Sequence, residues 1–282
     1  MATREDGVVD KPRLVASDVD GTLLDPAERI TDRTRRVIAR VLADDVPFVL
    51  VSGRPPRWIP RVARAAGLSG YAVCANGAAV YDIGADEVLT VEEVPAMTLH
   101  DVVHAVSSVL PEVRIAAERT SVGREQYRPF AIEAGFHNPW GNPSGEGDQP
   151  DIAPRAEVVG HPATKLLLRH RGMTSQQMST VVTDLLDSHD LEITYSSNSG
   201  LIEISAAGVT KASGLAWVCE HLDVPADKVV AFGDMPNDVP MLSWSGHGVA
   251  MADSHPDLLA VADEVTAPNS EDGVAQVLER WF

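Results

Sequence analysis

Short apolar runs rich in β-prone residues recur along the chain, and each leads directly into a polar residue. The residues that follow the runs are Asp18, Ser52, Asn76, Gly233-Asp234 and Ala252-Asp253. Continuous apolar runs of this length are typical of strands buried on both faces, as in a parallel sheet. We therefore predict strands at residues 13–17, 47–51, 71–75, 228–232 and 248–251.

Amphipathic helical patterns lie between these runs. At 31–42 the apolar side chains fall on one helical face, and Thr31 is a suitable N-cap. The stretch 55–66 has prolines at its start and a glycine just after its end, and a third helix is expected at 212–221. The alternation predicts an α/β fold with a Rossmann-like, doubly wound parallel sheet. In such sheets ligands bind beyond the carboxyl ends of the strands.

The middle third has a different pattern. Shorter, alternating strands are expected there at 113–117, 157–160, 165–169 and 192–195, with helices at 99–109 and 175–188. The segment 138–150 is rich in glycine and proline and is predicted to be a loop. We interpret this third as an α+β module inserted into the sheet domain. The expected division is a first core part at 1–82, an inserted domain at 83–198 and a second core part at 199–282.

Composition and charge narrow the class of protein. The 282 residues are 44% hydrophobic and 23% charged, enough apolar material for a sizeable core. The formal net charge of −18 disfavours nucleic acid and anionic membranes as partners. Two cysteines cannot make a disulfide framework, and we find neither a signal peptide nor an apolar run long enough to span a bilayer. We expect a cytoplasmic protein.

The first motif with chemical potential is Asp18-Val-Asp20-Gly21-Thr22, where the first predicted strand ends. Carboxylates at i and i+2 project to the same side of an extended chain, and the glycine permits a sharp turn. The alternative is an acidic loop that merely ends a strand.

Two further motifs are weak by themselves. Ser52-Gly53-Arg54 lies between a strand and a helix, where its amides and hydroxyl could hold an anion. It could equally be an ordinary turn. Lys211 opens a predicted helix, and an isolated lysine is usually a solvated surface residue.

The last motif, Gly233-Asp234-Met-Pro-Asn237-Asp238, follows another core strand. Asp234 or Asp238 could simply cap a helix. Together with Asp18 and Asp20, however, they put four carboxylates at strand ends of one sheet, where they would repel one another. A divalent cation with oxygen ligands removes that conflict, and Mg²⁺ fits such a set.

In their order and context, these motifs resemble the haloacid dehalogenase (HAD) superfamily. The sequence from Asn76 and the insertion after the third strand resemble its Cof-type subgroup, which carries a large C2-type cap. So do the tail segments Gly248-Val-Ala-Met, Ala262-Asp-Glu-Val-Thr and Asn269-Ser-Glu-Asp-Gly-Val. The resemblance spans the whole core and, more loosely, the cap.

The resemblance implies a role for each motif residue. Asp18 would be the nucleophile that forms an aspartyl-phosphate, and Asp20 the general acid and then the general base. Asp18, the carbonyl of Asp20, and Asp234 would hold Mg²⁺, with Asp238 supporting the metal shell. The phosphate would be bound by Ser52, Lys211 and the amides of Gly21 and Gly53, with help from Asn237. Arg54 and Asn76 are further candidates for contact with the substrate.

The implied activity is that of a Mg²⁺-dependent phosphatase for small phosphomonoesters, with sugar phosphates as the default class. A phosphotransferase or phosphomutase of the phosphomannomutase type is the alternative, and a non-enzymatic binding protein is a third reading. The chain is expected to be a monomer or a homodimer. Specificity is expected from the cap, where the candidates are Arg119, Arg124, Arg128, His137, His161, Lys165 and Trp140.

Overall fold

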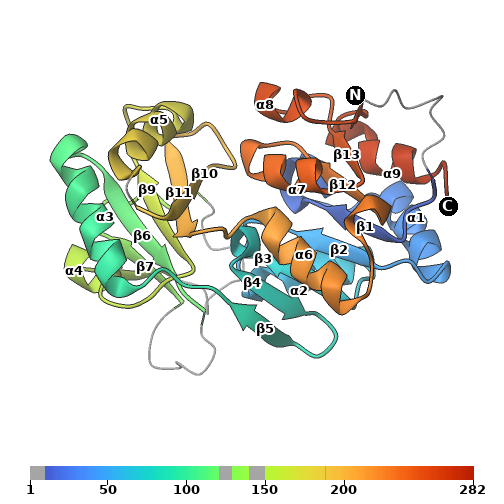
Figure 1. Cartoon of the computed structure of the whole chain (residues 1–282), viewed down its shortest axis with the longest axis horizontal. Helices are drawn as coiled ribbons and strands as arrows, with labels where there is room; N and C mark the ends of the chain where they lie inside the picture. Colours follow the sequence, from blue (N-terminus) through green and yellow to red (C-terminus); the bar gives the residue numbers. More distant parts are fainter. Residues whose placement is uncertain (1–9, 121–128, 140–149, 188) are drawn as a thin grey trace.

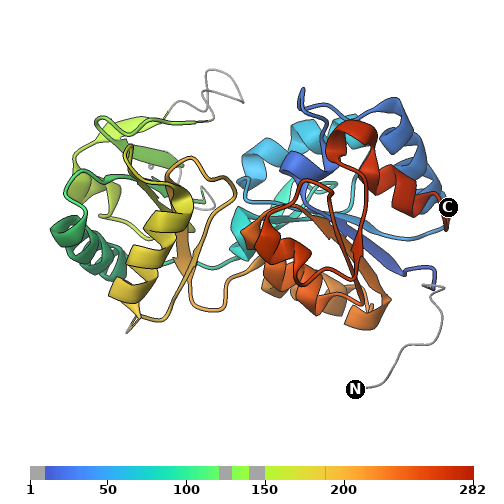
Figure 2. The same ribbon diagram turned by 90° about the horizontal axis from the view of Figure 1, so that it is seen from above.

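The structure is a computed structural model that describes residues 10–120, 129–139, 150–187 and 189–282. Its described strands form two sheets, which belong to two bodies that lie side by side (Figures 1 and 2). None of the described helices is both long and apolar enough to cross a bilayer.

The larger sheet has eight strands and forms the core domain. Its strands, in spatial order, are β14 (Glu264–Val265), β13 (His247–Ala250), β12 (Val229–Gly233), β1 (Leu14–Ser17), β2 (Phe48–Val51), β3 (Tyr71–Cys74), β4 (Ala79–Asp82) and β5 (Glu87–Val91). The pairs from β14 to β3 are parallel, and β4 and β5 are added antiparallel at one edge. This confirms the predicted α/β class and places the β1–β12 and β1–β2 pairs in the centre.

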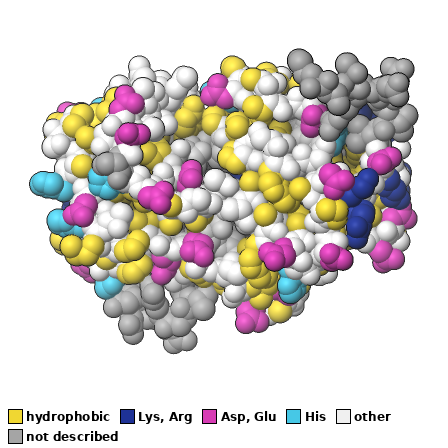
Figure 3. Space-filling model, viewed as in Figure 1, with side chains coloured by type: hydrophobic (Ala, Val, Ile, Leu, Met, Phe, Trp, Pro, Cys, Tyr) yellow, Lys and Arg dark blue, Asp and Glu magenta, His cyan; other side chains and the backbone are white. Residues whose placement is uncertain are grey.

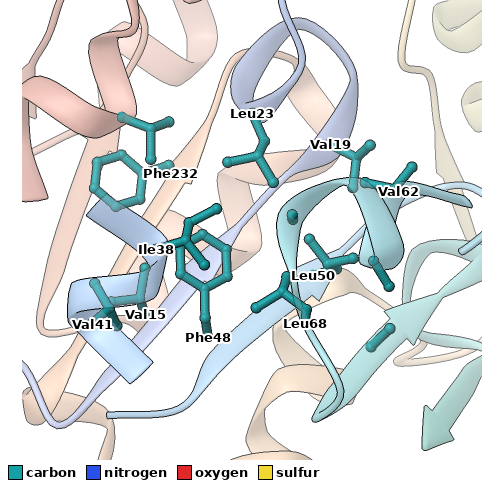
Figure 4. Packing of buried hydrophobic residues seen from close by; sticks show 14 of the residues in the cluster. Val15, Val19, Leu23, Ile38, Val41, Phe48, Leu50, Val62, Leu68 and Phe232 are labelled. Atoms are coloured by element: carbon teal, nitrogen blue, oxygen red, sulfur yellow. The ribbon is translucent and has the colours of Figure 1, made fainter. Parts of the chain in front are cut away.

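Helices cover both faces of this sheet. They are α1 (Asp32–Ala43), α2 (Ile59–Ala66), α6 (Lys211–His221), α7 (Val239–Trp244), α8 (Pro256–Leu259) and α9 (Gly273–Leu278). The apolar sides of α1, α2 and α9 pack on one face, as the cluster around Ile38, Phe48 and Phe232 in Figure 4 illustrates. Those of α6, α7 and α8 pack on the other. Strands buried from both sides account for the uninterrupted apolar runs in the sequence.

The smaller sheet belongs to the cap domain. Its order is β10 (Leu191–Thr194), β11 (Leu201–Ala206), β9 (Lys165–Arg169), β6 (Arg114–Glu118), β7 (Phe130–Glu133) and β8 (Asp151–Ala153). Three helices, α3 (Ala96–Val109), α4 (Arg155–Val158) and α5 (Ser175–Leu186), contribute to the cluster on one face. The opposite face holds a small cluster that includes Phe130, Leu167 and Leu201, and no described helix contributes to it.

Side chains of the cap strands alternate between these two faces. In β9, Leu166 and Leu168 point into the helix-covered core, while Lys165 and Leu167 line a cavity on the other side. In β11, Glu203 faces the same cavity. This is the period of two that a strand imposes on its side chains. The open face of the cap sheet therefore forms one wall of the cavity.

One predicted cap element is wrong. The strand expected at 157–160 is a helical turn, α4, which follows Pro154. The proline has a φ of −56° and leads the chain into the first helical turn, where its missing N–H costs nothing. A short apolar run cannot by itself distinguish a strand from a buried helix.

The two sheets divide the chain at different places from those expected. β5 lies after residue 82 but pairs with β4 in the core sheet. β11 lies after residue 198 but pairs with β9 and β10 in the cap sheet. The chain thus passes to the cap after β5 and returns to the core after β11.

The surface reflects the acidic composition. Carboxylates are scattered over both bodies on the face shown in Figure 3, while lysine and arginine side chains gather at one end of it. The cavity between the sheets differs from this surface, because several arginines line it.

Candidate active site

The central strands of the core sheet bring the sequence motifs together at one edge. β1 pairs with β2 on one side and with β12 on the other, so their carboxyl ends are adjacent. Asp18 follows β1, Ser52 follows β2 and Asp234 follows β12. Asp18 and Ser52 are 5% and 1% exposed. The structure therefore gathers residues that lie more than 200 positions apart in the sequence.

Lys211 is fully buried in the middle of this group. Its ammonium Nζ donates to Asp18 Oδ1 at 2.5 Å and to Asp238 Oδ1 at 2.6 Å. The residue is the first of α6, and the helix is held in place by a capping box between Thr210 and Ser213. A buried lysine with two carboxylate partners is a positive charge fixed in space, not a solvated surface residue.

Asp238 is completely buried and is satisfied by three donors. Besides Lys211, its Oδ2 accepts the backbone N–H groups of Asp234 and Met235, each at 3.1 Å. Gly233 makes room for it, because a Cβ at Gly233 would lie 2.5 Å from the carboxylate carbon. Asp238 thus shapes the turn that carries Asp234.

The carboxylates of Asp18, Asp234 and Asp238 offer oxygen atoms that lie within 4.8 Å of one another. Thr22 donates its hydroxyl to Asp234 Oδ1 at 3.1 Å. No described residue donates to Oδ2 of Asp18 or Asp234. A hard divalent cation such as Mg²⁺ fits this donor set, because it binds through a few carboxylates and keeps its waters.

Gly21 lets the chain pass close to this group. Its φ is +79°, in the left-handed region, and a Cβ there would lie 2.2 Å from Asp234 Oδ2. Only glycine meets both conditions without strain.

Burial, and then the crowding of negative charges, shifts the pKa values of these carboxylates. Burial, reinforced by the charges of Asp238 and Asp234, raises the pKa of Asp18 well above its usual range, although Lys211 opposes the shift. Burial and the charge of Asp238 raise the pKa of Asp234 to about 7. Burial would lower the pKa of Lys211, but Asp18 and Asp238 outweigh it and the pKa is raised. The site thus holds more negative charge than one lysine balances.

Asp20 lies outside this buried group. Its side chain is 53% exposed, and both of its oxygens accept from the Arg54 guanidinium, Nε to Oδ2 at 2.8 Å and NH2 to Oδ1 at 2.5 Å. Sequence reasoning singled out both residues but not their pairing, because 34 positions separate them. The pairing joins the first motif to the second.

All three carbonyl groups of the loop Ser52-Gly53-Arg54 accept hydrogen bonds from outside the loop. The carbonyl of Ser52 accepts from Asn76 N at 3.0 Å, and that of Arg54 accepts from Ala75 N at 2.9 Å. The carbonyl of Gly53 accepts from Lys165 Nζ, in the cap, at 2.7 Å. Within the loop, Arg54 N–H donates to Ser52 Oγ at 3.1 Å. The Ser52 hydroxyl therefore keeps its own proton available for a ligand.

Asn76 and Asn237 meet beside this loop. Asn237 Nδ2 donates to Asn76 Oδ1 at 3.2 Å, and Asn76 Nδ2 donates to Glu203 Oε2 at 2.9 Å. Glu203 also accepts from Lys165 at 2.6 Å. Sequence reasoning missed Glu203. Its only signal was a charged position in an alternating strand, Leu-Ile-Glu-Ile, which is also what a solvated strand shows.

These residues open onto a cavity of about 700 Å³ between the two sheets. Asp18, Asp20 and Asp234 lie at its core side, and the cap contributes Phe130, Leu167 and Leu201. The segment that leads into and forms α2 adds a basic wall. The cavity-lining residues of this segment are Pro55, Arg57, Trp58, Pro60, Arg61 and Arg64. A cavity of this size suits a small-molecule ligand.

The other cap candidates have different positions. Arg119 is buried and donates to the carbonyls of Glu157 and Val158, so it braces the cap itself. Lys165 lines the cavity, whereas His137 and His161 do not. Arg124, Arg128 and Trp140 lie outside the described residues, as does most of the loop expected at 138–150.

Comparison with known proteins gives consistent matches over the whole chain. The family described as haloacid dehalogenase-like hydrolase matches residues 15–278. A 5-amino-6-(5-phospho-D-ribitylamino)uracil phosphatase of Bacillus subtilis is 30% identical over 282 residues, covering 96% of this chain and 98% of the relative. An HMP-PP phosphatase of Serratia proteamaculans is 25% identical, covering 96% and 95%.

Solved structures agree on the fold. The protein SMU.1108c of Streptococcus mutans superposes with a TM-score of 0.80 at 22% identity, covering 96% of this chain and 98% of that one. A sugar phosphatase of HAD subclass IIB superposes with a TM-score of 0.78 at 20% identity, covering 95% and 98%.

Proposed function

The chain belongs to the haloacid dehalogenase-like hydrolases, and from that premise we propose that it is a Mg²⁺-dependent phosphatase of small phosphomonoesters. The observation that carries the proposal is the buried arrangement of Asp18 and Lys211 beside Asp234, at the edge of the cavity. The phosphatase relatives support the same class of reaction.

Asp18 is the proposed nucleophile. Its Oδ2, which has no donor among the described residues, would attack phosphorus and form an aspartyl-phosphate while the bond from phosphorus to the leaving oxygen breaks. Lys211 and the Ser52 hydroxyl would hold the phosphoryl oxygens. Asp18, Asp234 and the carbonyl of Asp20 would hold Mg²⁺, with Asp238 supporting that shell, and the metal would neutralise charge on the phosphoryl group.

Asp20 is the proposed general acid and base. Protonated, it would give its proton to the leaving alkoxide. As a carboxylate it would then take a proton from the water that attacks the aspartyl-phosphate, releasing inorganic phosphate and restoring Asp18. Its half-exposed position beside the cavity suits this work better than a place on the metal. Arg54 must release or turn with Asp20 when the substrate binds.

The cavity supports a small anionic substrate. Arg57 is paired with Glu118, but no described residue pairs with Arg61 or Arg64 in the part of the chain that the structure describes. These guanidiniums give a positive wall in a chain of net charge −18, which would attract phosphate esters. We propose sugar phosphates as the first class to examine, because polar and apolar surfaces both line the cavity.

The direct experiment measures inorganic phosphate released from a panel of phosphomonoesters, with Mg²⁺ and with EDTA. We expect Mg²⁺-dependent release that Asp18→Asn abolishes while the variant keeps its fold. Release that survives both EDTA and Asp18→Asn would contradict the mechanism. Transfer of the phosphoryl group to a sugar without phosphate release would indicate a phosphotransferase instead.

A further inference from the structure

A chain of buried and partly buried hydrogen bonds runs from the cap sheet to the proposed catalytic edge of the core sheet. It begins at the ion pair between Lys165 of β9 and Glu203 of β11, whose Nζ and Oε2 atoms are 2.6 Å apart. The two residues are 4% and 2% exposed. Neither is part of the proposed catalytic machinery, yet each forms a hydrogen bond with a residue of the core domain.

The first branch has a fixed direction. A carboxylate only accepts hydrogen bonds, so Glu203 requires the amide NH₂ of Asn76 to face it. Asn76 Oδ1 must then face away, and it accepts from Asn237 Nδ2 at 3.2 Å. The orientation of the Asn237 amide is thereby determined by a charge in the cap. Asn237 is 6% exposed and lies between Asp234 and Asp238 in the catalytic turn.

The second branch reaches the loop after β2. Lys165 Nζ donates to the carbonyl of Gly53 at 2.7 Å. Because a trans peptide is planar, holding this carbonyl on one side directs the N–H of Arg54 to the other. That N–H donates to Ser52 Oγ at 3.1 Å. The Ser52 hydroxyl therefore has an acceptor site filled and a proton left to donate.

We propose that Lys165 and Glu203 are positioning residues, which set the hydrogen-bond polarity of Ser52 and Asn237 at the phosphate-binding edge. The inference rests on the proposed function, because it assumes that this edge binds the phosphoryl group. It adds that the cap supplies two side chains that prepare the edge for that ligand, besides a wall of the cavity.

The ion pair between Lys165 and Glu203 does more than fill space in the cap. A buried ion pair seldom stabilises a fold beyond what apolar residues of the same volume would provide. Here the ammonium and the carboxylate each bond a separate core segment, and each branch ends on a polar group of the catalytic edge. A pair that served the cap alone would be satisfied within the cap, as Arg155 and Glu133 are.

The test changes which side chains donate and which accept hydrogen bonds between Glu203, Asn76 and Asn237. In Glu203→Gln the negative charge is lost and an NH₂ group competes with the remaining oxygen for the position that accepts from both Lys165 and Asn76, so Asn76 and Asn237 are held less strictly in one direction. In the double variant Asn76→Asp with Glu203→Gln, the new carboxylate at 76 accepts from both neighbours and restores the direction at Asn237 with the same net charge. Glu133→Gln is the matched control, since it breaks a cap ion pair outside the cavity.

Three quantities are measured on the full chain with Mg²⁺: the dissociation constant of inorganic phosphate, the NMR resonances of the Asn237 side-chain amide, and the melting temperature. We expect Glu203→Gln to weaken phosphate binding by about tenfold, the lower end of the effect that losing a supporting partner has at metal sites. Its Asn237 resonances should move, and the double variant should recover most of both changes. Glu133→Gln should alter the melting temperature only.

A second variant tests the other branch. Lys165→Met keeps the length of the side chain and should shift the backbone amide resonance of Arg54 while weakening phosphate binding. The inference is overturned if Glu203→Gln lowers the melting temperature but leaves the phosphate dissociation constant and the Asn237 resonances unchanged, or if the double variant recovers neither. Failure of the proposed function would appear differently, as a wild-type protein that binds phosphate but hydrolyses no ester.

Discussion

The guanidinium of Arg54 holds both oxygens of Asp20, with contacts of 2.8 and 2.5 Å. The two residues belong to different motifs, and their pair links the loops that follow β1 and β2. Asp20 is the only one of the four motif aspartates that exceeds half exposure, so its orientation depends on this partner more than on packing.

Removing the guanidinium should therefore misplace Asp20. We expect Arg54→Ala to lower kcat/KM by about 100-fold, the lower end of what a positioned proton donor contributes. Arg54→Lys should recover little, because an ammonium cannot bind both carboxylate oxygens in a fixed fork. Steady-state phosphate release measures both variants. Arg29→Ala, which removes an arginine–aspartate pair with Asp25 outside the cavity lining, is the control and should stay near wild type.

Magnesium binding should depend on pH through Asp234. Its pKa is about 7 in the folded, metal-free chain, against roughly 3.9 when unfolded, so the folded state binds more protons in between. This contribution to the free energy of unfolding therefore falls as pH rises from about 4 to about 7. Mg²⁺ needs the carboxylate, so its apparent affinity should rise over the same interval.

This linkage is measured by melting temperatures recorded with and without Mg²⁺. The pH is varied from about 5 to about 8, a range that brackets the pKa of Asp234. The stabilisation by Mg²⁺ should grow with pH and level off above about pH 7. A Mg²⁺ effect that is constant across the range would contradict the assignment of Asp234 to the metal. Asp184→Asn, at an exposed position on α5 of the cap, should leave the profile unchanged.

Gly21 and Gly67 offer a matched pair of substitutions. Their φ angles are +79° and +75°, so alanine strains the backbone similarly at both. At Gly67 the added Cβ meets nothing within 4 Å, but at Gly21 it would lie 2.2 Å from Asp234 Oδ2. We expect both variants to lose about 1 kcal/mol of stability from backbone strain. Only Gly21→Ala should also weaken Mg²⁺ binding, measured by calorimetry; equal Mg²⁺ affinity in both would show that Gly21 does not shape the metal site.

The arginines of the basic wall should affect the binding of substrate more than its hydrolysis. Reversing both charges, in Arg61→Glu with Arg64→Glu, should raise KM by about tenfold and leave kcat nearly unchanged, since neither arginine is among the residues proposed to act on the phosphoryl group. The difference from wild type should shrink at high ionic strength. Arg35→Glu with Arg36→Glu, on α1 and outside the cavity, is the control. A fall in kcat with constant KM would contradict this role.

The core fold was predictable because its strands are buried on both faces. The runs before Asp18, Ser52 and Asp234 are apolar except for Ser17 and Gly233, and the polar residue that follows each run lies at the proposed catalytic edge. The resemblance then placed Lys211, whose burial no local pattern revealed. The roles carried over to these residues stay proposals that the variants above test.

The cap was harder to predict, for physical reasons. β5 is largely exposed or half-buried and β11 almost wholly buried, so neither contrasts with its surroundings in a way that shows which sheet it joins. The helical turn α4 is too short for its period to be visible. Glu203 and Asn76 meet across 127 positions, and only the assembled sheets show that the strand carrying Glu203 faces the proposed catalytic edge.

The alternation along β9 and β11 has a consequence for how such an enzyme changes over evolution. Every second side chain, such as Leu166 and Leu168, packs in the helix-covered core, while the positions between them line the cavity. Mutations at Leu167 or Leu201 can alter the shape of the cavity with little disturbance of the helix-covered core. Selection for folding and selection for substrate preference therefore act on different side chains of the same strand. Substrate preference can drift within one lineage while the scaffold stays the same.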